Sequence, residues 1–195
     1  DLGLETTGIE TDEKGFIKVD DHLKTACDGV WAFGDCIGRH LFRHSANFEG
    51  EYLFRTLFAE PSNEAVRYET VPHAVFTMPQ IGGIGKTEQQ LQAEGVDYVV
   101  GKCNYIKSGM GMALLSDHGF VKLLFDRKDR KLIGAHIIGE EASNMIHMPI
   151  AYMNMGATID DLLKTIYIHP ALPELVRNAA RSAAREFQRP TQATR

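Results

Sequence analysis

The sequence predicts an α+β fold in which helices pack on an antiparallel sheet. A hairpin pattern is the first observation, because the apolar segments 120–125 and 131–138 flank a polar turn from Asp126 to Arg130. The second is an amphipathic final helix, in which apolar residues recur at helical spacing from Leu175 to Phe187. Strands that pair locally, combined with a helix that is apolar on one side, favour a helix-covered antiparallel sheet.

The chain divides by composition into two regions. Residues 1–58 form the first region, and the polar, proline-broken segment 59–70 indicates a linker. Residues 71–195 form the second region, to which the sheet and most helices are assigned. The chain begins with Asp rather than Met, so it is expected to be a piece of a longer protein.

Three elements are expected in the first region. The segment Phe16–Asp20 alternates apolar and polar residues, as a half-buried strand does. The apolar run Val30–Phe33 predicts a buried strand that ends in the turn Gly34–Asp35. The segment from about His44 to Phe58 is helical in character.

The second region opens with a short helix and a strand. Thr87 to Gln90 fits a capping box, so a helix is expected to start there and to close at Gly95. A strand is expected to begin at Tyr98. Within the hairpin, His136 is expected to be a hydrogen-bonded strand residue rather than a metal ligand.

Two further helices carry large apolar surfaces. The helix 142–153 is apolar almost all round, so it should be buried on several sides, kinked near Met145 by Pro149 and ended by Gly156. Together with the last helix, whose other side carries Arg177, it exposes more apolar surface than a monomer tolerates, which predicts a homodimer. The tail after Gln188 is expected to be frayed.

Composition excludes several classes of protein. The net charge of −5 is built from both signs, so no nucleic-acid partner is expected. No apolar run approaches the ~20 residues of a membrane span, and no signal peptide is evident, so no membrane partner is expected. Three cysteines without a close pairing motif favour a reducing, cytoplasmic location.

The segment from His169 to Glu174 is the strongest candidate for catalysis. It places an imidazole and a carboxylate five residues apart across a turn stiffened by Pro170 and Pro173. Histidine moves protons near neutral pH, and a carboxylate partner fixes its tautomer. A capped helix after a loop explains the same residues, and on spacing alone the two interpretations have similar weight.

A ligand-binding turn is the second candidate. A strand that ends in Gly34-Asp35 lets the backbone approach a ligand, while the carboxylate accepts hydrogen bonds from hydroxyl groups. Residues 41–46 should begin a helix, whose N-terminus carries about half a positive charge. His40 and His44 share a spacing with zinc ligands but lack a third ligand nearby, so no metal site is predicted.

Four motifs in sequence order resemble one family: residues 30–35, 41–46, 77–80 with 83–88, and 169–174. They resemble the C-terminal part of flavoprotein disulfide reductases, the group that includes dihydrolipoamide dehydrogenase, glutathione reductase, mycothione reductase and mercuric reductase. The resemblance implies the end of an FAD-binding α/β domain followed by a dimerisation domain. It also implies that the longer protein uses FAD together with NAD or NADP.

The resemblance assigns roles to particular residues. His169 would be the acid–base that serves a substrate thiol, and Glu174 would orient its ring. This pair would act in the active site of the partner subunit, on a small disulfide or dithiol substrate. The turn and the following helix start would bind FAD through Gly34, Asp35, Leu41, Phe42, Arg43, His44 and Ala46.

The absent motifs limit these expectations. The chain has no Gly-x-Gly-x-x-Gly and no Cys-x-x-x-x-Cys, so the fragment alone is expected to bind no cofactor and to be inactive. Asn144, Met148-Pro149 and Ala171 depart from the usual dihydrolipoamide dehydrogenase pattern, so a mycothione- or mercuric-type reductase stays open. A non-catalytic dimerisation module stays open as well, as does a flavin reductase that uses oxygen or a metal ion.

Overall fold

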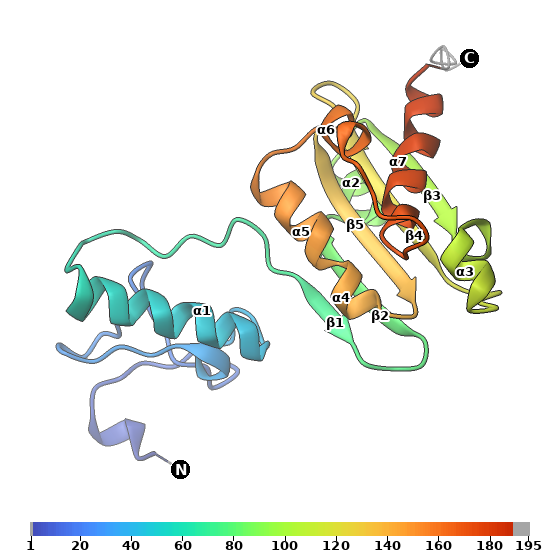
Figure 1. The fold of residues 1–195 in the computed structure, drawn as a ribbon. Helices are drawn as coiled ribbons and strands as arrows, with labels where there is room; N and C mark the ends of the chain where they lie inside the picture. The colour runs from blue at the N-terminus through green and yellow to red at the C-terminus, as the bar shows by residue number, and fades with distance from the viewer. Residues whose placement is uncertain (1, 189–195) are drawn as a thin grey trace. The chain divides into compact units, whose positions relative to one another are not determined.

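The computed structural model describes residues 2–188 and divides the chain into two compact units. The first unit ends at Val71 and the second begins at Pro72 (Figure 1). The expected fraying after Gln188 falls on residues 189–195, which lie outside the described residues. No helix between residues 2 and 188 has both the length and the apolar character needed to cross a membrane.

Unit 1 is built around one long helix. The helix α1 (Arg43–Phe54) continues into a π-helical turn, η3 (Arg55–Ala59), which agrees with the helix expected from about His44 to Phe58. Two short 3₁₀ turns precede it, η1 (Leu4–Thr6) and η2 (Gly34–Ile37). Its small core consists of Leu23, Ala32, Ile37, Tyr52, Leu53 and Val66.

The two strands expected in unit 1 do not form in its described part. Each segment makes one isolated bridge instead, Thr11 with Ile17 and Lys24 with Trp31. A strand needs a neighbouring strand for its backbone groups, and an apolar pattern does not supply one. Hydrogen bonds flank each bridge, from the Lys18 N–H to the Glu10 carbonyl and from the Ala32 N–H to the Leu23 carbonyl, but neither pairing extends into a regular strand.

The segment 59–70 has no regular structure beyond Ala59, yet it packs on unit 1. Val66 is buried in the core, and the Tyr52 hydroxyl donates a hydrogen bond to the carbonyl oxygen of Glu64 at 2.5 Å. The segment therefore differs from a free linker, because its side chains complete the core of the first unit.

Unit 2 contains one five-stranded antiparallel sheet, which confirms the predicted fold class. Its strands lie in the order β1-β2-β5-β4-β3, so β1 and β3 form the two edges (Figure 1). The predicted hairpin is β4 with β5, in which Leu123 pairs with Ala135. The strands are β1 (His73–Val75), β2 (Gln80–Gly85), β3 (Tyr98–Asn104), β4 (Phe120–Asp126) and β5 (Leu132–Gly139).

The helices of unit 2 follow their sequence signals closely. Thr87 and Gln90 form the predicted capping box at the start of α2, and Gly95 has the positive φ of a residue that ends a helix. His136 is hydrogen-bonded through Nε2 to the Lys86 carbonyl oxygen at 3.1 Å, as expected of a strand residue. The helices are α2 (Glu88–Ala93), η4 (Tyr105–Lys107), α3 (Gly109–Ala113), α4 (Ala142–Met145), α5 (His147–Asn154), α6 (Ile159–Lys164) and α7 (Glu174–Phe187).

The helix expected over 142–153 is interrupted. It forms as α4 and α5, which meet at Ile146, because Pro149 has no N–H to donate to the carbonyl four residues earlier. The expectation that it is buried on several sides is wrong within a single chain. Only Pro149 is buried in α5, while Ala151 and Asn154 are exposed.

The apolar stripe of α7 is buried against the sheet of its own chain. Leu175, Val176 and Ala179 are fully buried, and α7 packs chiefly on β3 and β4. Gly101 in β3 permits this approach, because a Cβ atom there would overlap the carbonyl oxygen of Ala179. The argument for a dimer from this helix is therefore wrong, since its apolar face is already covered.

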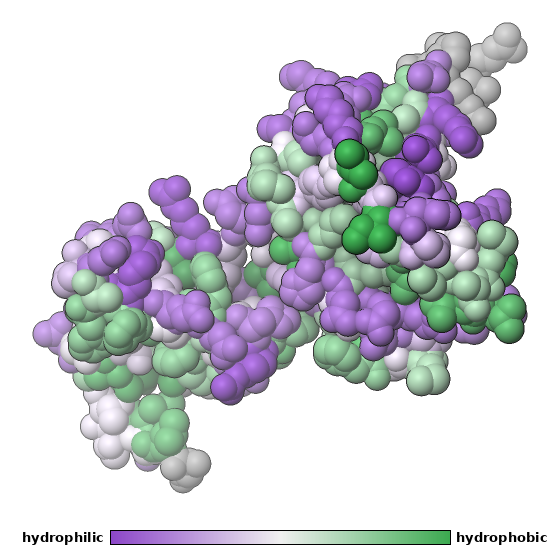
Figure 2. Space-filling view, viewed as in Figure 1, coloured by the Kyte–Doolittle hydropathy of each residue, from purple (hydrophilic) through white to green (hydrophobic). Residues whose placement is uncertain are grey.

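Other apolar residues of unit 2 are exposed. They lie in the β1–β2 connection, after α3 and just before His169, and Figure 2 shows several apolar residues at the surface of this unit. The most exposed are Phe76, Met78, Leu115, Ile166 and Ile168. These residues, rather than α7, form the uncovered apolar surface of unit 2.

Candidate active site and cofactor-binding turn

His169 and Glu174 meet where a loop enters α7. The imidazole Nδ1 lies 3.1 Å from Oε1 and 3.0 Å from Oε2 of the carboxylate. The two side chains differ sharply in burial, because that of Glu174 is 5% exposed and that of His169 is 72% exposed. The site therefore presents an open imidazole on a buried carboxylate.

Three donors hold the Glu174 carboxylate. Besides His169, the Ala171 N–H donates to Oε2 at 3.1 Å, and Nη2 of Arg177 donates to Oε1 at 2.8 Å. The bond from Ala171, followed by those from His169 and Arg177, lowers the pKa of Glu174 against the opposing effect of burial. The carboxyl group is therefore ionised at neutral pH.

The ionised carboxylate determines the tautomer of His169. A carboxylate only accepts hydrogen bonds, so Nδ1 carries the proton and donates it to Glu174. Nε2 is then the basic nitrogen, and it has no partner among residues 2–188. The arrangement can take a proton from a group outside this chain, or return one to it.

Arg177 is a site residue that the sequence reasoning missed. Its sequence position indicates only the polar side of the last helix, whereas it contacts Glu174 and lies with its guanidinium 5.5 Å from the centre of the Tyr167 ring. The spacing of three residues between Glu174 and Arg177 is a signal for such a pair on a helix.

The turn Gly34–Asp35 lies at the start of η2 in unit 1. Gly34 has φ of 75°, which favours glycine, and a Cβ atom there would lie 3.1 Å from the Cβ of Ala46. The turn is thus pressed against α1, which brings two of the predicted cofactor residues together. The Asp35 side chain is exposed, and its carboxylate has no partner within the described residues, so it is available to accept hydrogen bonds.

The other predicted cofactor residues surround the start of α1. Phe42 is the N-cap, and no side chain caps the first turn, so backbone N–H groups of Arg43 and Ser45 point out of the helix. The ring of Phe42 stacks on that of His44, with centroids 5.1 Å apart, and Leu41 is exposed. An uncapped helix start favours a negatively polarised group of a ligand.

Glu49 is the second residue that the sequence reasoning missed. It is fully buried, and it accepts the Gly34 N–H at Oε2 and the Tyr68 hydroxyl at Oε1, each at 2.5 Å. Burial, together with Glu49, raises the pKa of Tyr68 to about 12. Glu49 shares the buried side of α1 with Tyr52 and Leu53, and a polar residue at such a position is a signal that the sequence does contain.

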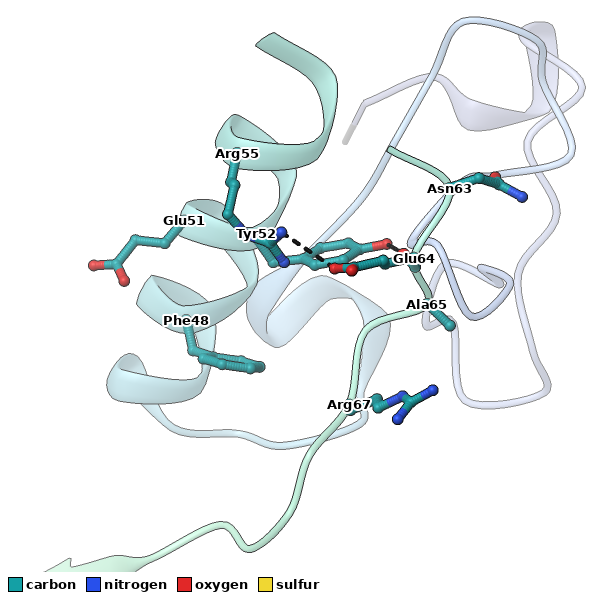
Figure 3. Close-up of a pocket in the computed structure, with 8 residues that line it drawn as sticks. All are labelled: Phe48, Glu51, Tyr52, Arg55, Asn63, Glu64, Ala65 and Arg67. Atoms are coloured by element: carbon teal, nitrogen blue, oxygen red, sulfur yellow. Dashed lines mark hydrogen bonds and ion pairs between the residues drawn. The ribbon is translucent and has the colours of Figure 1, made fainter. Parts of the chain in front are cut away.

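A cavity in unit 1 is lined by none of the predicted site residues. Its volume is about 640 Å³, and it lies between α1 and the segment 63–67 (Figure 3). Arg55 pairs with Glu64 across it at 3.2 Å. Within residues 2–188, no three His, Cys, Asp or Glu side chains converge as metal ligands would, and Cys27, Cys36 and Cys103 are free thiols.

Comparison with known proteins identifies the family. The pyridine nucleotide-disulphide oxidoreductase dimerisation domain matches residues 71–180, and the pyridine nucleotide-disulphide oxidoreductase domain matches residues 1–76. Since the first match covers more than half of the chain, the chain belongs to the pyridine nucleotide-disulphide oxidoreductase family.

Curated relatives are dihydrolipoyl dehydrogenases. That of Cupriavidus necator is 35% identical over 179 residues, which is 92% of this chain and 37% of the relative. That of Halobacterium salinarum is 37% identical over 182 residues, 93% of this chain and 38% of the relative. The chain thus spans less than two fifths of the length of these two relatives.

Solved structures give the same result for the fold. The HOCl-induced flavoprotein disulfide reductase RclA from Escherichia coli matches with a TM-score of 0.86 and 26% identity, over 92% of this chain and 41% of that one. LpdA from Mycobacterium tuberculosis matches with a TM-score of 0.83 and 27% identity, over 92% of this chain and 39% of that one.

Proposed function

We propose that this chain is the C-terminal part of an FAD-dependent NAD(P)H:disulfide oxidoreductase, resembling dihydrolipoamide dehydrogenase. The observation that carries the proposal is the pair of His169 and Glu174, in which a buried, ionised carboxylate holds an imidazole that is open to other molecules. A module that only dimerises has no need of this arrangement. The family of the chain and the names of its curated relatives support the same activity.

His169 acts as the acid–base for a thiol of a small dithiol or disulfide substrate. Nε2 takes the proton of the thiol, and the thiolate that forms is the species that attacks a disulfide. Glu174 stabilises the imidazolium produced in this step and keeps Nδ1 as the donor. In the reverse direction the imidazolium returns the proton to the leaving thiolate.

The residues around α1 fit an FAD group of the longer protein. Asp35 would accept hydrogen bonds from the ribityl hydroxyls, and the segment from Leu41 to Ala46, which includes the uncapped first turn of α1, would face the flavin ring. The buried hydroxyl of Ser45, which lacks a partner among the described residues, is consistent with a group that binds at this surface. When bound, the flavin carries electrons between the nicotinamide cofactor and a cysteine pair outside this chain.

The protein acts as a homodimer in which His169 reaches the active site of the partner subunit. Two properties support this arrangement: the imidazole projects from its own chain, and the exposed Ile166 and Ile168 precede it directly. Apolar residues beside a protruding catalytic group are typical of a surface that another subunit covers. The free thiols favour a reducing compartment such as the cytoplasm.

Substitution of His169 in the full-length protein tests the proposal. We expect His169→Gln to lower turnover of a dithiol substrate by about 10²- to 10⁴-fold, because general acid–base catalysis contributes about this much. The measurement is steady-state reduction of NAD⁺ by dihydrolipoamide, with flavin content determined for each variant.

His118→Gln is the matched control. His118 is also 72% exposed and also contacts a carboxylate, that of Asp117, but it lies outside the proposed site. Its substitution should leave turnover unchanged. Turnover of His169→Gln within about threefold of the wild type would contradict the proposed role.

A further inference from the structure

A groove of about 490 Å³ lies on unit 2, between the end of β3 and α7. Four cations line it, Lys102 and Lys107 on one wall and Arg181 and Arg185 on the other, and we call this surface the basic groove. Among residues 2–188 no acidic side chain lines it, although the chain as a whole carries a net charge of −5. Positive charge is therefore concentrated at this place.

The cations of the basic groove differ from most other cations of unit 2. Within the described part of the chain, Lys107, Arg181 and Arg185 form no ion pair, and Lys102 lies 3.9 Å above the Phe120 ring. Six other cations of the unit are matched with carboxylates, whereas Lys128 and Lys164 form no ion pair among the described residues. The pairs are Lys86 with Glu94, Lys122 with Glu88, Arg127 with Asp97, Arg130 with Asp160, Lys131 with Asp129 and Arg177 with Glu174. The unpaired cations of the basic groove can therefore attract negatively charged groups of another molecule.

The α7 wall of the groove is held firmly against the sheet. Asn178, Arg181, Ser182 and Arg185 line it, and their spacing places them in one stripe that spans about 10 Å of helix. The contact of Gly101 with the Ala179 backbone fixes this helix on β3. Both walls are thus in position before any ligand arrives.

The opposite wall is formed by a sheet edge. β3 pairs with β4 on one side and, among the described residues, with no strand on the other. Backbone N–H and C=O groups along this side are free to pair with a further extended segment. Lys102, Cys103 and Asn104 of β3 line the groove, so the free edge and the cations lie together.

We propose that the basic groove binds an extended acidic segment of another protein, which adds a strand to the edge of β3. Backbone pairing supplies the fixed register, and carboxylates on the α7 side of the segment contact Arg181 and Arg185. No aromatic ring of residues 2–188 lines the groove, so this part of the chain offers none of the stacking surface that nucleotides and single-stranded nucleic acids use. The proposal is independent of the reductase activity.

Peptide binding to the full-length protein tests this proposal. The probe is a fluorescein-labelled peptide of alternating Glu and Val residues, in which an extended backbone places all carboxylates on one side. We expect it to bind, whereas the equivalent Lys and Val peptide does not. Arg181→Glu combined with Arg185→Glu should weaken binding at least about tenfold, measured by fluorescence anisotropy at low salt.

Lys14→Glu combined with Lys128→Glu is the matched control, because it changes the net charge equally at exposed residues that do not line the groove. This control should shift affinity less than about twofold. Should the double reversal fail to fold, Arg181→Gln with Arg185→Gln removes the same charges with less repulsion. Equal loss in the groove variants and in the control would overturn the proposal.

Two further measurements separate strand addition from other anion binding. Methylation of alternate peptide amides should abolish binding, and the bound peptide should slow hydrogen exchange of β3 amides. Binding that methylation leaves unchanged would overturn the proposal, as would an affinity for pyrophosphate or a DNA oligonucleotide equal to that for the peptide. Neither readout depends on dithiol turnover, so failure here is distinct from failure of the proposed function.

Discussion

Unit 2 pairs its strands and buries its apolar residues within the unit, whereas unit 1 does so only in part. In unit 2 every strand has a partner, and the large core contains fully buried residues such as Ile84, Leu123 and Leu175. The described part of unit 1 has isolated bridges in place of strands and a core of six buried residues. Phe54 and Phe58 of its long helix and helical turn are exposed. The comparison shows that local patterns lead to regular structure only where the chain also supplies the surface that they pack on.

Separating the two units should give the largest effect. We expect residues 72–188 alone to unfold in one cooperative urea transition, because their core lies within the unit. Residues 2–71 alone should show no cooperative transition, because too little apolar surface is buried. Circular dichroism across a urea titration measures both. Cooperative unfolding of residues 2–71 would show that the small core is sufficient.

Gly101→Ala should cause the next largest effect. The added methyl group would overlap the Ala179 carbonyl oxygen and approach the Ala183 Cβ to 2.9 Å, so α7 must move off the sheet. We expect a loss of about 2–3 kcal/mol in the free energy of unfolding. Gly50→Ala in α1 is the control, because the added methyl group meets only the half-exposed ring of Phe33. Equal losses in the free energy of unfolding would contradict the prediction that α7 packs closely on β3 only because residue 101 is glycine.

The smallest effect should be the change with pH in the stability difference between the wild type and Glu174→Gln. The pKa of Glu174 is lowered from 4.5, so its ionised form stabilises the folded state above that value, and this contribution is lost as pH falls through the lowered pKa. The wild type should therefore be more stable than Glu174→Gln at about pH 7, and the difference should shrink at about pH 3. Urea unfolding at both values measures it. A difference that does not depend on pH would show that the carboxylate charge is irrelevant to stability.

Much of unit 2 was predictable from the sequence, because its signals are local. The capping box at Thr87, the hairpin around Asp126 and the interruption caused by Pro149 each depend on residues close together in the chain. The strands expected at Phe16 and Val30 depend on partners elsewhere, and alternation alone does not reveal whether such partners exist.

The sequence predicted which residues of the candidate site would lie together, but not which side chains hold them in place. His169 and Glu174 contact each other as their spacing suggested, and Gly34 lies against Ala46. Arg177 and Glu49 were missed because their roles come from side-chain contacts within folded surroundings. The spacing of charges also gave no indication that one carboxylate is buried and its imidazole exposed.

The close packing of Gly101 on the Ala179 backbone also affects the imidazole of His169, which lies beside the N-terminus of α7. Glu174 is the first residue of that helix, so its carboxylate is as fixed as the helix itself. The ring of His169 belongs to a loop, but its orientation is imposed through Glu174 by the helix and, beneath it, by the sheet. In the proposed reaction, the nitrogen that exchanges a proton with the substrate thiol is therefore oriented by the packed core of unit 2 rather than by the loop that carries it.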